Sequence, residues 1–379
     1  MSVVARARRA SVALLILGAC LSLPAHEDEA AAAARMPQRA ALLARAQAEL
    51  ERGDAGPALD DFERAAMMLH AADAELGLIR AAMQDGQYRR ALAFCAHTAG
   101  EHTDDAQGGA LYAWLLRVGG QPAQASRTLA DVRTHAPEDP LAAAVDRALA
   151  SSQPPIATGT LLQPPQRMAP WQVMLEAQPA PPASASFASN AVLVDDGAAA
   201  LVPRSALPWP APARVWVRNG LGQATAATLD AGDAALSSRG LARLLLQARM
   251  PVGASTASTA RAPFAGSPGY VLQFGTGDAP AWPLLTQGFL GGLVRGTDLR
   301  KLGFEGSPGA AVLDARGALV GITLASVDGD VTWLPLASSA PLQAPSPSPS
   351  PAGLALAAPD QAYEAGLRRA LQVLVDAPR

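Results

Sequence analysis

A period of 33 to 34 residues constrains the N-terminal part of this chain more than any other feature. In each unit a glycine is followed five positions later by an alanine and then, four positions further, by a larger apolar residue. The three units read Gly53, Ala58 and Phe62; Gly86, Ala91 and Cys95; and Gly120, Ala125 and Leu129. The glycine suits the turn between two helices, the alanine permits close helix contact, and the larger residue packs between them. The pattern therefore predicts a stack of helical hairpins.

This repeat resembles the tetratricopeptide family, whose period is about 34 residues. Three such repeats, over residues 37–150, are about the minimum for a stable α-solenoid, and residues 141–150 are expected to cap it. The resemblance implies a concave surface that binds a protein or peptide partner. A generic alanine-rich helical array is the alternative, and it predicts the same helices.

A different pattern, of short β-type runs separated by Gly and Pro, fills residues 185–337. Regular short strands with turn signals predict an all-β barrel or sandwich. The fold class is therefore multidomain α + β, with an N-terminal α-solenoid followed by an all-β domain. The predicted strands are 191–194, 214–218, 270–274, 288–294, 311–313, 319–324 and 331–336.

Segments rich in proline flank the predicted β domain. Residues 151–184 are rich in Pro and Ala and are expected to be a linker that includes a first strand at 171–175. Residues 338–358 contain a Pro/Ser tract and predict a second, extended linker. Beyond it, residues 359–379 are expected to form a C-terminal helix, capped by Asp360 and apolar along one face through Leu374.

The first 25 residues have the pattern of a bacterial export signal. Three arginines precede the apolar run 10–19, which is too short to span a bilayer. The run ends in Leu-Gly-Ala-Cys and resembles a lipobox, which implies that Cys20 is lipidated and becomes the mature N-terminus; cleavage near Ala25 is the alternative. Residues 26–36 are expected to be a mobile leader. Because Leu21, and not an aspartate, follows the cysteine, we expect an outer-membrane lipoprotein facing the periplasm, or otherwise a soluble periplasmic or secreted protein.

The composition excludes several classes of function. With a net charge of −3 and a pI near 6.0, the chain has no basic field to attract nucleic acid. No phosphate loop or dinucleotide motif is present, so we expect no cofactor. If Cys20 is lipidated or removed, Cys95 is the remaining cysteine, and no disulfide is then possible within the chain. The oligomeric state is left open.

The β region resembles a trypsin-like serine peptidase domain of the HtrA type. Five segments match that family in the correct order: 189–197, 215–220, 286–290, 314–322 and 331–336. The resemblance implies a chymotrypsin-fold double β-barrel. It also implies a catalytic triad, in which a serine needs a base, and the base needs an acid to orient it.

The positions that correspond to the triad do not carry those residues. Ser205 stands at the histidine position, and a hydroxyl cannot accept a proton from another hydroxyl at neutral pH. All five histidines (26, 70, 97, 102 and 135) precede the β domain. Gly240 stands at the aspartate position, with Asp230 and Asp233 as nearby alternatives.

Pro308 stands at the position of the nucleophilic serine. It provides neither a hydroxyl nor a backbone N–H, and this family uses that N–H in the oxyanion hole. Gly306 retains the other oxyanion donor. Ser307 is a nucleophile only if the loop slips by one residue, and Lys301 is then the single lysine available to activate it. A turn residue is the simpler interpretation of Ser307.

These observations predict a pseudopeptidase and not an enzyme. We expect a cell-envelope scaffold or adaptor that binds a protein or peptide through its repeats and its inactive trypsin-like domain. Two alternatives remain: an active HtrA-like endopeptidase with a non-standard site, and a repeat-only binding module with a structural β domain. His97, His102, Asp104 and Asp105 form a polar cluster between repeats, which we interpret as a solvated loop, so no metal site is predicted.

Overall fold

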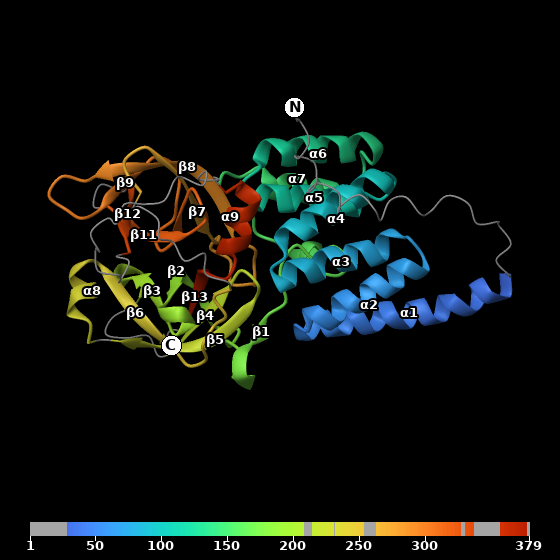
Figure 1. Ribbon diagram of the computed structural model, residues 1–379, viewed down its shortest axis with the longest axis horizontal. Helices are drawn as coiled ribbons and strands as arrows, with labels where there is room; N and C mark the ends of the chain where they lie inside the picture. The colour runs from blue at the N-terminus through green and yellow to red at the C-terminus, as the bar shows by residue number, and fades with distance from the viewer. Residues whose placement is uncertain are drawn as a thin grey trace, which may run out of the picture.

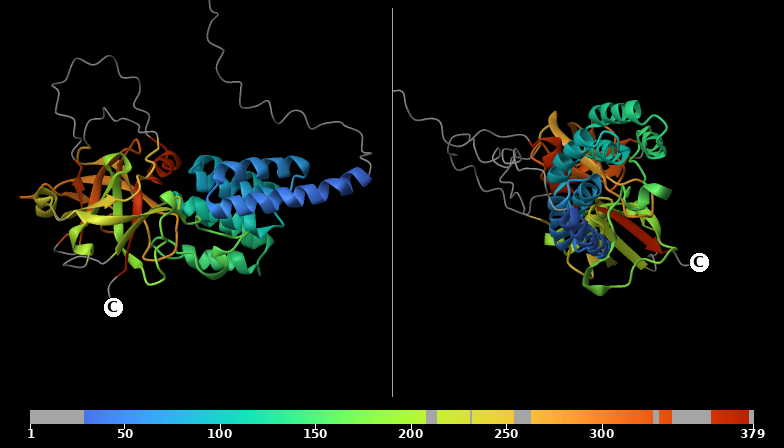
Figure 2. Two further views of the ribbon diagram at one scale, coloured as in Figure 1. Left: turned by 90° about the horizontal axis from the view of Figure 1, so that it is seen from below. Right: turned by 90° about the vertical axis from the view of Figure 1, so that its right-hand side faces the viewer.

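A computed structural model describes residues 29–207, 214–230, 232–253, 263–326, 330–336 and 357–376. An α-helical module is followed by two β-barrels, and the two parts lie side by side along the long axis of the molecule (Figures 1 and 2). This is the α + β multidomain class that the sequence predicts. The export signal and most of the Pro/Ser tract lie outside the described residues.

The helical module consists of three hairpins and a closing helix. Ala58, Ala91 and Ala125 are each at most 1% exposed, as the repeat predicts. Gly86 has a φ of +83° at the turn between α3 and α4, where a left-handed residue ends the first helix. The helices are α1 (Glu29–Arg52), α2 (Ala55–Met68), α3 (Ala72–Asp85), α4 (Tyr88–Glu101), α5 (Ala106–Val118), α6 (Pro122–His135) and α7 (Pro140–Leu149).

The leader prediction is wrong over most of its length, because helix α1 already begins at Glu29. Alanine, which repeats at the start of this helix, has the highest helix propensity of all residue types.

No helix in the described part of the chain combines the length and apolar character needed to cross a membrane.

The segment that joins the two modules is packed between them. It contains the short helices η1 (Gly159–Leu162) and η2 (Leu175–Ala177) and the two-residue strand β1 (Val173–Met174). Trp171 is 9% exposed, and its backbone N–H donates to the side chain of Gln84 on α3 at 3.0 Å. The proline-rich stretch therefore helps to fix the two modules together.

The first barrel closes through six strands in the order β5-β4-β13-β2-β3-β6, with β5 paired to β6 and with β1 added beside β5. Alternating buried residues from its strands, such as Val217 and Leu244, fill the interior. The strands are β2 (Ser186–Val194), β3 (Ala199–Pro203), β4 (Arg214–Asn219), β5 (Gln223–Asp230), β6 (Leu241–Leu246) and β13 (Ala370–Asp376).

The C-terminus corrects the sequence prediction. Helix α9 (Pro359–Gly366) forms, but Ala358 and not Asp360 is its N-cap, and residues Ala370–Asp376 form strand β13. This strand pairs with β2 on one side and β4 on the other, so it fills the gap that would otherwise leave the first barrel open. Valines at 373 and 375 favour a strand, and hydrogen bonding to β2 and β4 outweighs the helical spacing of the leucines.

The second barrel closes in the order β10-β11-β12-β9-β8-β7. Every strand predicted for this part of the sequence is present, and β9 is additional. Trp333 and Val271 lie in its interior core. The strands are β7 (Ser267–Gln273), β8 (Leu284–Leu293), β9 (Arg300–Leu302), β10 (Ala311–Asp314), β11 (Leu319–Ala325) and β12 (Val331–Pro335); a short helix α8 (Ala234–Ser238) precedes β6.

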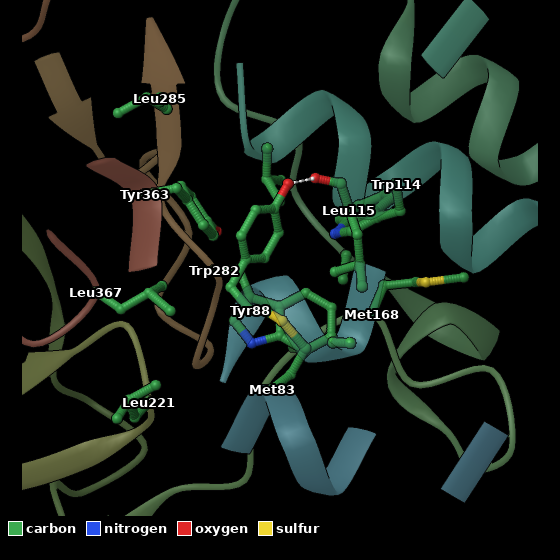
Figure 3. Packing of buried hydrophobic residues seen from close by; sticks show 14 of the residues in the cluster. Met83, Tyr88, Trp114, Leu115, Met168, Leu221, Trp282, Leu285, Tyr363 and Leu367 are labelled. Carbon is green, nitrogen blue, oxygen red and sulfur yellow. Dashed lines mark hydrogen bonds between the residues drawn. The ribbon is translucent and has the colours of Figure 1, made fainter. Parts of the chain in front are cut away.

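The helical module and the barrels share one hydrophobic core (Figure 3). Tyr88 of α4 packs against Tyr363 of α9, with ring centroids 4.4 Å apart. The Tyr88 hydroxyl donates to the carbonyl of Leu115, and the Tyr363 hydroxyl donates to the carbonyl of Pro283. Burial raises the pKa of both phenols well above the usual value, so they remain neutral donors.

Candidate functional site

The loop of residues 306–309 lies between β9 and β10 of the second barrel. The backbone N–H of Ser307 donates to the side-chain oxygen of Gln273, which is 4% exposed. The carbonyl of Ser307 accepts from the Thr323 hydroxyl and from the backbone N–H of Ala310. These bonds fix the loop in one conformation and occupy the Ser307 N–H with a protein acceptor.

Contacts to the first barrel hold the same loop from the other side. Gly309 has a φ of +84°, and a Cβ placed there would lie 1.9 Å from the carbonyl oxygen of Asn190 on β2. The carbonyl of Pro308 lies 3.5 Å from the Ser189 hydroxyl, which donates to it. Only glycine fits such a close approach of two backbones. The loop that carries Pro308 therefore lies at the junction of the two barrels.

Ser205 and Gly240 lie near each other at one end of the first barrel. Ser205 is exposed in the short helix η4 (Arg204–Ala206), and the backbone N–H of Arg204 donates to the carbonyl of Gly240 at 2.9 Å. The structure therefore brings Ser205 and Gly240 together at this end of the barrel.

The two nearby aspartates have local structural roles. Asp233 accepts a hydrogen bond from the Leu236 N–H and caps helix α8. Asp230 accepts a hydrogen bond from the N–H of Gly232, within its own turn. Both carboxylates therefore accept hydrogen bonds from nearby backbone.

A cleft of about 850 Å³ opens beside the Pro308 loop. Its walls combine polar side chains, backbone and a few apolar groups, and neither Ser205 nor Gly240 contributes to the lining. Lys301 and Ser307 both line it, but no hydrogen bond joins them in the described part of the chain. The polar and charged residues of the lining include Gln153, Lys301, Glu305, Ser307, Asp330 and Thr332.

The helical module borders this cleft. Gln153 belongs to the segment that leaves α7, and it lines the cleft with residues of the second barrel. Arg117 of α5 donates to the carbonyl of Ser151 at 3.2 Å. Partial burial lowers the pKa of Arg117, and the negative charge of Glu305, a cleft residue, opposes that shift. The segment that leaves α7 therefore forms part of the recess wall, and Arg117 interacts electrostatically with Glu305 at its edge.

The described lining of this recess can form hydrogen bonds and ion pairs. It includes one ammonium, two carboxylates, and several amides and hydroxyls. The chain has no imidazole after residue 135 to act as a base for a serine hydroxyl. Pro308 provides no N–H to stabilise an oxyanion.

The sequence identifies the loop but not the groups that hold it. Gln273 and Thr323 lie on strands β7 and β11, where a polar residue is expected to face outward. Both are nevertheless buried, because their side chains bond the backbone of the Pro308 loop. The sequence signal that could have identified Gln273 and Thr323 is a polar residue inside an otherwise apolar run.

Comparisons with known proteins add little to these observations. No family model matches the chain, and no curated protein matches it either. Among solved structures, the apo protease domain of MamO from Magnetospirillum magneticum is 16% identical, with a TM-score of 0.31. That alignment covers 41% of this chain and 87% of the MamO domain. The double barrel of this chain rests on its strand pairings and not on this distant likeness.

Proposed function

We propose that this protein is an envelope scaffold that binds a polypeptide segment without cutting it. The observation that supports this most directly is the lack of any histidine from residue 136 to residue 379, on a trypsin-like double barrel whose chemistry needs one. Pro308 at the nucleophile position and the occupied N–H of Ser307 point the same way.

The cleft beside the Pro308 loop is the proposed binding surface. An extended peptide there would meet the charged groups Lys301, Glu305 and Asp330. Val294, Leu302 and Phe304 in the lining offer apolar contact. The concave face of the tetratricopeptide-like helices is a second contact surface in the same proposal.

The proposed location is the periplasmic face of the outer membrane, with the chain anchored through lipid on Cys20. Mass spectrometry of the mature N-terminus tests this part. A diacylglycerol-modified Cys20 supports it. A mature chain that begins at His26 refutes the anchor, since that terminus indicates ordinary signal cleavage.

Two measurements on the full chain test the central proposal. The first is casein turnover: we expect none above a heat-killed control, and cleavage that Ser307→Ala abolishes would instead establish a peptidase. The second is peptide capture from a library of extended sequences. We expect Ser307→Trp, which fills the cleft, to weaken capture at least tenfold, and Arg127→Trp, at an exposed position on α6, to leave it unchanged.

Point variants are preferred to deletion of the β domain, because the helical module and the barrels share a core. If Ser307→Trp leaves peptide capture unchanged, the cleft is not the binding surface. Recognition then belongs to the helices, and the barrels support them.

A further inference from the structure

Three histidines and a buried glutamate converge at one end of the α3–α4 hairpin. Glu75 is 3% exposed in the first turn of α3, and His70 lies in the loop before that helix. His97 lies in α4, and His102 is its C-cap. The sequence separates these residues by up to 32 positions, and only the pairing of α3 with α4 brings them together.

The distances among three of these side chains approach those that a metal ion requires. His70 Nε2 lies 2.7 Å from Glu75 Oε1, and His102 Nε2 lies 3.6 Å from Glu75 Oε2. One ligand atom each from His70, Glu75 and His102 all lie within 4.8 Å of one another. Tetrahedral zinc, with ligands about 2.0–2.1 Å from the ion, separates its ligand atoms by about 3.3 Å. The three groups therefore need only small adjustments to share one ion.

His97 lies beside this trio. Its Nε2 is 3.0 Å from His70 Nε2 and 3.5 Å from Glu75 Oε1. This half-exposed imidazole is therefore the candidate for a fourth ligand position. Imidazole nitrogens with one carboxylate oxygen form a donor set that suits zinc.

Two further observations indicate a ligand. His102 Nε2 is buried and has no hydrogen-bond partner, although it is directed at the Glu75 carboxylate. The Thr98 hydroxyl donates to Glu75 Oε2 at 2.6 Å, which orients the carboxylate as an outer hydrogen bond orients a metal ligand. The C-terminal end of α4, where partial negative charge gathers, also favours a cation.

We propose that His70, Glu75 and His102 bind a zinc ion, with His97 as the fourth ligand. The ion would join the loop before α3 to the C-terminal end of α4 and so fix the second helical hairpin. Asp105 is not part of the site, because its carboxylate caps helix α5 by accepting from the Gln107 N–H. This inference is independent of the peptide-binding proposal.

Zinc titration of the full chain, purified without a histidine tag and stripped with a chelator, tests the site. We expect one zinc per chain by calorimetry and a rise in the unfolding temperature, since a ligand that binds only the native state stabilises it. The double variant His70→Asn/His102→Gln should lose about tenfold or more in zinc affinity. His135→Ala, an exposed histidine on α6, is the matched control and should bind as the unaltered chain does.

Substitution of Co²⁺ for zinc gives a second readout, because tetrahedral coordination produces strong visible absorption that the double variant should lose. Far-UV circular dichroism shows whether each variant folds, and Glu75→Gln, which keeps the shape of the side chain, serves if the double variant does not. Equal zinc affinity in the unaltered chain and a folded ligand variant would overturn the site. Unchanged affinity in His97→Ala would overturn the assignment of His97.

Discussion

Replacing Leu371 in strand β13 by alanine tests the most unexpected part of the fold. Leu371 is fully buried inside the first barrel and pairs with Ala191 on β2 and Asn219 on β4. Truncating a buried leucine to alanine costs about 2–5 kcal/mol, because apolar contact is lost and a cavity remains. Total stability of a folded protein is about 5–15 kcal/mol, so this single change removes a large share of it.

Urea unfolding, followed by tryptophan fluorescence and by far-UV circular dichroism, measures the effect. We expect Leu371→Ala to lower the free energy of unfolding by about 2–5 kcal/mol. The matched control is Leu293→Ala on β8, which is 64% exposed and should change stability by no more than about 0.5 kcal/mol. If Leu371→Ala behaves like this control, β13 does not close the first barrel and the strand order of that barrel is wrong.

Three further substitutions or reactions have defined outcomes. Tyr363→Phe should destabilise the protein by about 1–3 kcal/mol in the same urea assay, since it leaves a buried carbonyl without its donor. Gly309→Ala should destabilise it more than Gly296→Ala: both have positive φ, but only the first would force a Cβ to within 1.9 Å of the carbonyl oxygen of Asn190. Cys95 is fully buried, and burial raises its thiol pKa, so peptide mapping should find it unlabelled by thiol reagents until urea unfolds the chain.

The helical hairpins could be predicted from the sequence because their signal is local. Gly86 ends α3 in a left-handed conformation, and Ala91, five residues later, sits fully buried where two helices meet. The glycine in the turn and the small residue at the helix contact both lie within one repeat, and the pair occurs three times in the sequence. The strands of the second barrel were predictable for a similar reason, since alternating apolar runs and turn residues define each strand on its own.

The candidate sites were predictable only in part. The sequence places Pro308 in a turn, but the bond from the Ser307 N–H to Gln273 depends on how β7 lies against that turn. The histidine cluster depends still more on tertiary structure. His97 and His102 are close in sequence, whereas Glu75 reaches them only after α3 packs on α4.

The segment that follows the Pro/Ser tract shows why the end of the chain could not be predicted from its own pattern. Helix α9 places Tyr363 against Tyr88 of the helical module, and Gly366 lies against Leu272 of the second barrel. Strand β13 then enters the first barrel between β2 and β4. This one segment therefore contacts all three parts of the molecule, and its conformation is set by the surfaces that they leave open. For the same reason, we expect the helical core to unfold together with the first barrel once β13 leaves it. The urea unfolding transitions measured by tryptophan fluorescence and by far-UV circular dichroism should therefore coincide.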